Sequence, residues 1–162
     1  ESEEKAVVYY LNYARINPRQ FCEKYVKPHA PWYKGYAFDE RKESLIETLN
    51  TMTPILGGEI KPDENLYELA QCFAAKSGEL GITGHDRSAT QCTYLTGTWG
   101  ECCDYGHAGG LEIVLSLLID AGENNAALGH RKICLDPAYT KIGVSMQPHR
   151  NYGNIAVLDF GN

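Results

Sequence analysis

Three side chains able to bind a metal ion or move a proton stand out in the chain: His85, Glu101 and His130. His85 precedes Glu101 by 16 positions, and His130 follows Glu101 by 29 positions, so they belong to separate elements. Clefts are usually built from polar groups that come from different elements and converge in space. We therefore expect these three side chains to meet around one solvent-accessible cleft.

Imidazole nitrogens and carboxylate oxygens are both ligands for Zn²⁺. The residue types therefore favour a site for Zn²⁺ or another divalent cation, with His85 and His130 as ligands and Glu101 as a further one. If such an ion kept an open position, its bound water would be activated for hydrolysis. The alternative is that the three side chains only hydrogen-bond in a polar cleft that orders the fold.

The other candidate groups are weaker. Neither Ser88 nor Ser116 lies in a Gly-x-Ser-x-Gly motif, so the sequence argues against a serine hydrolase. His107 is expected to be a solvated loop residue, and His29 and His149 lie beside prolines in loops and receive no role.

Composition bounds the class of protein. The 162 residues suggest one domain over residues 1–162, and 43% hydrophobic with 22% charged residues is ordinary for a globular protein. The net charge of −6 and the lack of a basic cluster argue against nucleic acid as a partner. No apolar run is long enough for a transmembrane segment, and the polar start of the chain resembles a mature protein after removal of a leader.

The six cysteines include no Cys-x-x-Cys pair, which argues against a zinc knuckle or a thioredoxin-type site. An even number without metal spacing favours disulfides and an oxidising compartment, with free buried thiols as the alternative. If the chain is extended at Cys102 and Cys103, their side chains point to opposite faces and bond to different partners. Six cysteines allow fifteen connectivities, and the sequence does not choose among them.

Hydrophobic periodicity predicts the elements that must position these groups. Helices are expected over residues 3–15, directly after Asn17-Pro18, over 41–52, from an Asp63 cap to Ser77, and over 111–121. Strands are expected over residues 141–146 and 152–160, paired as a hairpin, with irregular extended chain over 90–100. Helices first and strands last indicate an α+β fold rather than a doubly wound sheet.

Two segments have alternative interpretations. Glu112, Ser116 and Asp120 are spaced by four and form one polar stripe on the otherwise apolar helix 111–121, which could face water. The aromatic loop from Trp32 to Phe38 could contact a lipid, sugar or peptide, or it could lie over the sheet as a lid on the core.

An ordered set of short motifs runs through nearly the whole chain. The set is Leu11-Asn12-Tyr13-Ala14-Arg15-Ile16-Asn17-Pro18, Gly84-His85-Asp86, Gly100-Glu101, Gly129-His130-Arg131, Asp136-Pro137-Ala138-Tyr139 and Ile142-Gly143-Val144. In this order the motifs resemble the CAP superfamily, also called SCP-like (cysteine-rich secretory proteins, antigen 5, pathogenesis-related 1), and look closer to its bacterial branch. A literal Gly-Glu-Asn at 122–124 is set aside, because Gly100-Glu101 has the better spacing from both histidines.

The resemblance implies an α-β-α sandwich with a small antiparallel sheet packed between helices, in a protein that is usually secreted and often disulfide-bonded. It also implies a cleft with two histidines and two acids that binds a divalent metal in some members. The histidines match His85 and His130, and the first acid matches Glu101. Asp120 stands roughly where the second acid is expected, one methylene shorter, and Cys102 stands where the family often has Asn.

We therefore expect a secreted SCP-like module that is not an enzyme. It is predicted to bind an unknown small-molecule, lipid or protein ligand through a cleft lined by His85, Glu101, Asp120 and His130, with a divalent metal as an option. The expected location is extracellular or periplasmic, with a surface lipoprotein as one variant. The alternative is a metal-dependent peptidase or esterase in which Glu101 acts as ligand or general base.

Overall fold

The structure is a computed structural model, and it describes residues 2–162. Its helical elements are α1 (Ser2–Ile16), α2 (Pro18–Phe21), the π-helical turn η1 (Cys22–Val26), α3 (Phe38–Thr51), α4 (Glu64–Leu80), α5 (Gly110–Ile119), the 3-10 turn η2 (Glu123–Asn125) and α6 (Gly129–Cys134). Its strands are β1 (Lys61–Pro62), β2 (Trp99–Tyr105), β3 (Lys141–His149) and β4 (Gly153–Gly161).

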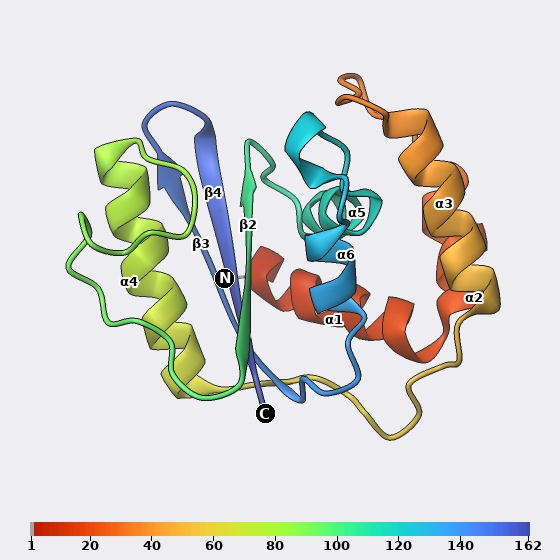
Figure 1. Cartoon of the computed structure of the whole chain (residues 1–162), viewed down its shortest axis with the longest axis horizontal. Coiled ribbons are helices and arrows are strands. Elements are labelled where there is room, and N and C mark those ends of the chain that lie inside the picture. The colour runs from red at the N-terminus through yellow and green to blue at the C-terminus, as the bar shows by residue number, and fades with distance from the viewer. Residues whose placement is uncertain (1) are drawn as a thin grey trace.

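The four strands form one sheet in the order β1-β3-β4-β2. The predicted hairpin of β3 and β4 is confirmed, and β2 adds antiparallel to β4 with Glu101 opposite Asp159. The two-residue β1 pairs in parallel with the start of β3, so the sheet is mixed at one end. Helix α4 covers one face of the sheet, and α1, α5 and α6 lie on the other, which confirms the predicted α+β sandwich (Figure 1).

Each face of the sheet has its own hydrophobic core, as alternation along a strand requires. On β4, Ala156, Leu158 and Phe160 belong to the larger core with α1 and α5. The intervening Ile155 and Val157 pack with α4 in a smaller core. The side chains of β2 alternate in the same way, and this decides which face each site residue occupies.

Helix α1 is joined to the rest of the fold by two buried polar side chains of its motif. The Asn12 amide both donates to and accepts from the backbone of Ile60, at 2.9 Å each. Buried Arg15 donates to the carbonyls of Cys134 and Asp136 at 2.9 Å, which holds the end of α6. Buried polar groups need partners of this kind, because an unpaired one costs about 1–3 kcal/mol.

Helix α4 begins and packs as its sequence requires. The Asp63 side chain accepts a hydrogen bond from Leu66 N at 3.0 Å, which confirms the predicted cap. The helix then lies directly on β3, because Gly143 has no side chain where the backbone of Leu66 and Tyr67 crosses it. A β-carbon at Gly143 would lie 2.1 Å from Leu66 C.

One disulfide, Cys72–Cys92, joins α4 to the loop before β2. The other four cysteines are buried free thiols: Cys22, Cys102, Cys103 and Cys134. Cys102 and Cys103 do point to opposite cores, as expected for a strand, but the prediction that each forms a disulfide is wrong. The alternative, a free buried thiol, is therefore correct for both of them.

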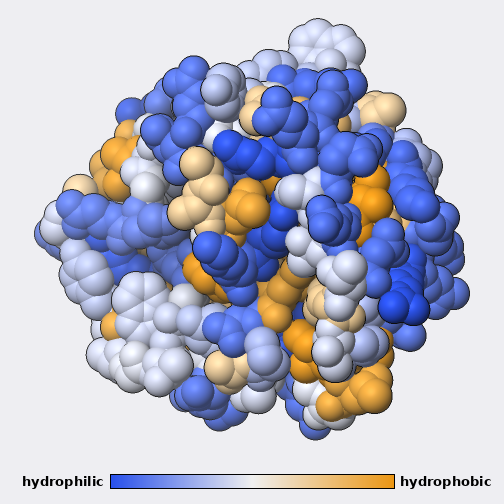
Figure 2. All heavy atoms as spheres, turned by 45° about the vertical axis from the view of Figure 1, so that its right-hand side comes forward, coloured by the Kyte–Doolittle hydropathy of each residue, from blue (hydrophilic) through white to orange (hydrophobic). Residues whose placement is uncertain are grey.

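The aromatic loop is not a lid over the core. Trp32 is 99% exposed, and Tyr33 and Tyr36 are also exposed, whereas only Phe38 at the start of α3 is buried. Figure 2 shows that the face on the α3 side is largely hydrophilic, with apolar side chains in scattered patches. Within residues 2–162, no helix is both long and apolar enough to cross a bilayer.

Candidate functional site

The first pair of predicted site residues is in direct contact. His85, in the loop after α4, makes a hydrogen bond from Nδ1 to Glu101 Oε1 on β2 at 2.8 Å. The imidazole is 52% exposed while the carboxylate is 3% exposed, so a buried acid holds a solvent-accessible ring. Glu101 alternates with Cys102 along β2 and therefore faces the α4 side of the sheet.

Arg87 is a buried part of this site that sequence reasoning missed. Its Nη2 donates to Glu101 Oε2 and, at 3.1 Å, to Asp159 Oδ2 on β4. Its Nη1 donates to the carbonyls of Leu69 on α4 and Thr93 in the loop, and the guanidinium lies 4.5 Å from the Phe73 ring centroid. One guanidinium thus fixes the loop that carries His85 to both the helix and the sheet.

A sequence signal for this cluster did exist. Asp159 is the one acidic residue in the apolar strand Gly153–Gly161, where a charge is rarely buried without a partner. Arg87 lies two positions after His85, so it could have been proposed as that partner.

The two carboxyl groups beside Arg87 have opposite pKa shifts. Burial alone would raise the pKa of Glu101, but hydrogen bonds from His85, Asp159 and Arg87 outweigh it and lower that pKa to about 2. Burial, followed by the hydrogen bond and charge of Glu101, raises the pKa of Asp159 to about 9. Asp159 Oδ2 accepts from Arg87, whereas Oδ1 is buried with no partner among the hydrogen bonds found within residues 2–162. At neutral pH the pair therefore holds one proton, with Glu101 as the carboxylate.

Asp159→Asn is expected to remove a pH dependence of stability. Above about pH 4 an unfolded aspartate is deprotonated, whereas folded Asp159 keeps its proton to about pH 9. Unfolding between these values releases a proton, so stability falls as pH rises, by up to about 1.4 kcal/mol per pH unit. The amide of the substituted side chain has no proton to lose in this range, so the slope disappears.

Urea denaturation at several values between pH 5 and pH 8 measures the slope of the free energy of unfolding. The matched control is Asp39→Asn, which removes an exposed carboxylate on α3 and should keep the wild-type slope. Equal slopes for the wild type and Asp159→Asn would show that Asp159 is ionised in the folded protein.

The second pair of predicted residues is also in contact. Asp120 Oδ1 accepts from His130 Nδ1 at 2.8 Å, and Asp120 Oδ2 accepts from the backbone N–H of His130 at 3.0 Å. Asp120 is only 1% exposed and follows α5 with a left-handed backbone of φ 58°. Aspartate tolerates this conformation better than most residues, and the shorter acid still reaches the ring.

The idea that Asp120 shares a solvated stripe with Ser116 and Glu112 is therefore wrong. Ser116 Oγ donates to Asp104 on β2 at 2.8 Å, and only Glu112 faces water. The helix ends at Ile119, so the spacing by four no longer describes where Asp120 points.

Asp120→Ala is expected to lower the free energy of unfolding by about 1–3 kcal/mol, because it leaves the His130 ring and backbone N–H without their acceptor. Urea denaturation measures this loss, and NMR of the imidazole nitrogens reports whether Nδ1 keeps its proton. Glu123→Ala, an exposed acid in the following turn, is the control and should change neither quantity. An unchanged His130 spectrum in Asp120→Ala would contradict the pairing.

The two pairs lie on either side of the edge strand β2. His85 and Glu101 are on its α4 face, whereas the His130 carbonyl lies 3.9 Å from Cys102 Sγ, which points to the other face. A third His–acid pair, His107 Nδ1 to Asp104 Oδ2 at 2.8 Å, lies farther along β2, and its Asp104 hydrogen bond raises the pKa of His107. His107 is thus a paired residue rather than a freely solvated one.

The donor group that the structure brings together within 4.8 Å, across residues 2–162, is His85, Glu101 and Cys103. Cys103 was not a predicted ligand. Burial, followed by the charges of Glu101 and Asp159, raises the pKa of the Cys103 thiol well above its ordinary value. The thiolate is the form that binds a metal, so a metal bound here would have to displace the thiol proton.

A family model covers the segment of the chain that contains these pairs. The model of the family described as "CAP: Cysteine-rich secretory protein family" matches residues 58–160, which include all three His–acid pairs. No curated protein and no solved structure matches the chain. Because the matched segment covers more than half of its length, the chain belongs to the CAP, or cysteine-rich secretory protein, family.

Proposed function

We propose that this SCP-like domain binds a ligand at a cleft lined by His85, Glu101, Asp120 and His130, with a divalent cation such as Zn²⁺ held by the two imidazoles. One observation carries the proposal: each ring has its Nδ1 fixed by a buried carboxylate at 2.8 Å. Metal-binding histidines are typically oriented in this way by a carboxylate on the other nitrogen.

The chemistry of the two donor groups suits such a cation. Neither Nε2 atom has a hydrogen-bond partner among the described side chains and backbone groups, so both are available as ligands. Both Glu101 oxygens are occupied, one by His85 and one by Arg87. Glu101 therefore orients the His85 ring rather than binding the cation itself. A bound Zn²⁺ would supply a Lewis acid for an anionic or carbonyl oxygen of the ligand.

Zinc titration by calorimetry tests the proposal. His85→Ala/His130→Ala is expected to weaken zinc binding more than tenfold, since both ligands are removed. His29→Ala/His107→Ala removes the same number of imidazoles elsewhere and should bind zinc like the wild type.

Two single variants separate this site from the alternative set of His85, Glu101 and Cys103. If the imidazole pair holds the ion, His130→Ala weakens binding and Cys103→Ser does not. The reverse result would assign zinc to the Cys103 set and overturn the proposal that both histidines share one cleft. Equal binding by the wild type and the double variant would reject both sites.

A binding module is the better supported function, and the metal-dependent hydrolase is the weaker one. A general base works best with a pKa near the working pH, whereas the pKa of Glu101 is lowered to about 2 by its hydrogen bonds despite burial. We expect no turnover of a panel of peptides and esters. Turnover that is lost in Glu101→Gln would favour the hydrolase instead.

We also propose that residues 1–162 form one domain, although the family match begins at residue 58. The two hydrogen bonds between the Asn12 side chain and the Ile60 backbone support this, because they join α1 to the matched segment. The two parts also share one hydrophobic core, in which α1 packs with β3 and β4. That the chain belongs to the bacterial branch stays a prediction. So does an extracellular or periplasmic location, with a surface lipoprotein as a variant. The Cys72–Cys92 disulfide supports an oxidising compartment.

A further inference from the structure

The edge of the sheet opposite to β2 has an incomplete strand partner. β3 pairs with β4 along its whole length, Lys141–His149, but β1 covers only Lys141 and Ile142 on its other side. From Gly143 onward this side of β3 has no strand beside it in the part of the chain described. An uncovered strand edge is a template for pairing with another chain.

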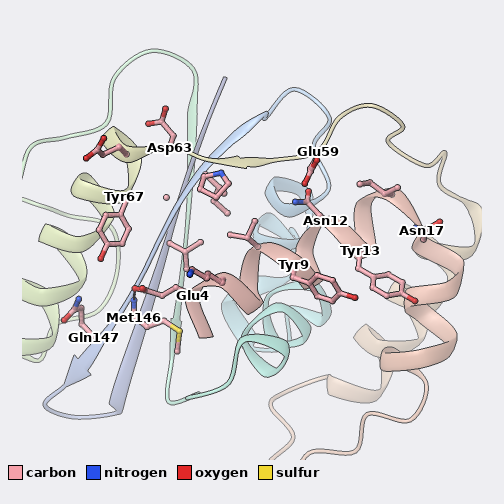
Figure 3. Close-up of a pocket in the computed structure, with 18 of the residues that line it drawn as sticks. Glu4, Tyr9, Asn12, Tyr13, Asn17, Glu59, Asp63, Tyr67, Met146 and Gln147 are labelled. Atoms are coloured by element: carbon pink, nitrogen blue, oxygen red, sulfur yellow. Dashed lines mark hydrogen bonds between the residues drawn. The ribbon is translucent and has the colours of Figure 1, made fainter. Parts of the chain in front are cut away.

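A groove of about 1360 Å³ runs along this edge, between α1 and α4. Its lining includes Ile142, Gly143, Val144, Met146 and Gln147 of β3. Figure 3 shows Tyr9 and Tyr13 of α1 on one side of β3 and Tyr67 of α4 on the other. The groove therefore has a backbone floor and aromatic walls, the arrangement that recognises an extended peptide by strand addition.

A side chain already occupies one of the backbone groups on this edge. The N–H of Met146 donates to Glu4 Oε2 of α1 at 2.8 Å, where a neighbouring strand would supply a carbonyl oxygen. The N–H of Met146 is therefore directed away from β4 and into the groove. A peptide carbonyl would take the place of this carboxylate as the acceptor of the Met146 N–H.

The charges along the groove indicate which charge such a peptide would carry. Four acidic residues line it, Glu4, Glu59, Asp63 and Glu64, against one basic residue, Lys5. Glu59 and Glu64 are exposed and have no ion-pair partner among the described residues. The groove thus favours a cationic ligand with apolar groups for its tyrosine walls.

We propose that the groove between α1 and α4 binds an extended peptide of alternating basic and apolar residues, which pairs with β3 as an added strand. The residues from Gly143 to Gln147 offer an edge of roughly 16 Å, enough for about five residues at 3.3 Å each. The site lies at the opposite edge of the sheet from His85 and Glu101, so it does not depend on the proposed metal.

A synthetic Lys-Val-Lys-Val-Lys-Val peptide with blocked ends is the probe. Added to the ¹⁵N-labelled protein at about 1 mM, it is expected to shift the amide resonances of Val144 and Met146. N–H groups alternate in direction along a strand, so the lysines and the valines present theirs to opposite sides. N-methylation of one set should therefore weaken binding at least tenfold, and N-methylation of the other set should leave it nearly unchanged.

Charge is tested with the protein variant Glu59→Lys/Glu64→Lys, which should weaken the peptide about tenfold at low salt and less at high salt. The control Glu47→Lys/Glu68→Lys makes the same charge change at two exposed glutamates outside the groove and should bind like the wild type. Matching melting temperatures show that both variants are folded.

Three results would overturn the proposal. They are no shift at Val144 and Met146 at about 1 mM peptide, equal binding by both N-methylated peptides, and equal binding by the two charge variants. Two other results would assign the groove to another occupant. One is a concentration-dependent dimer that places β3 against β3. The other is displacement of the peptide by a fatty acid whose own affinity is the same for the wild type and Glu59→Lys/Glu64→Lys.

Discussion

Replacing Arg87 with methionine is expected to lower the free energy of unfolding by about 3–5 kcal/mol, the cost of leaving buried charge without its partner. Arg87 is 2% exposed and is the only cation within hydrogen-bond distance of either Glu101 or Asp159 in residues 2–162, apart from the exposed His85 ring. Methionine keeps much of the aliphatic volume beside Phe73 but donates no hydrogen bond. Urea denaturation at pH 7 measures the loss.

Two further variants identify the cause of this loss. Arg150→Met removes an exposed arginine with no carboxylate partner and should change stability by less than about 0.5 kcal/mol. Asp159→Asn in the Arg87→Met background should recover part of the loss, because one buried carboxyl group is removed. A loss below about 1 kcal/mol for Arg87→Met would mean that water enters the site and that the cluster is not buried.

Gly143→Ala is expected to cost about 3 kcal/mol or more, because the clash is with backbone rather than with a flexible side chain. The added β-carbon would lie 2.1 Å from Leu66 C, 2.2 Å from Tyr67 N and 2.4 Å from Leu66 O. Helix α4 must then move away from β3, which also widens the groove and shifts the loop that carries His85. Urea denaturation gives the loss, and the amide spectrum locates the displacement.

Gly129→Ala is the matched control, since a β-carbon there has no heavy atom within 4 Å. Gly129 directly precedes His130, and Gly143 lies in the motif Ile142-Gly143-Val144. The same substitution is therefore compared at one glycine of each motif. Gly129→Ala should leave stability within about 0.5 kcal/mol of the wild type. Equal effects at both positions would show that α4 does not approach β3 this closely.

Long amphipathic elements are the part of the fold that sequence patterns predict best. The stripe from Leu66 to Ser77 identifies α4, and its Asp63 cap is recognisable because capping is a local interaction. The hairpin of β3 and β4 follows from two apolar runs joined across Pro148 to Gly153. Each of these signals is contained within one element, so it needs no knowledge of the partner.

Short elements and edge strands give weaker signals. The sequence Gly-Glu-Cys-Cys-Asp of β2 has no polar and apolar alternation, because both of its faces are buried and Glu101 has Arg87 as partner. Helix α6 has six residues, too few for a helical period to distinguish it from a turn. β1 has two residues, and it pairs with β3 next to Ile60, which Asn12 holds against α1.

The sequence by itself determined the α+β class, the main helices and the terminal hairpin, and it suggested the four side chains proposed for the cleft. These follow from residue type, periodicity and an ordered set of motifs, all of which are local or one-dimensional. Tertiary structure alone decided which acid orients which imidazole, that Arg87 and Asp159 stand behind Glu101, and that most cysteines are free. It also decided that β3 leaves an edge open between two helices. The physical reason is that burial, pKa and pairing depend on neighbours far apart in the chain, and only the packed fold brings them together.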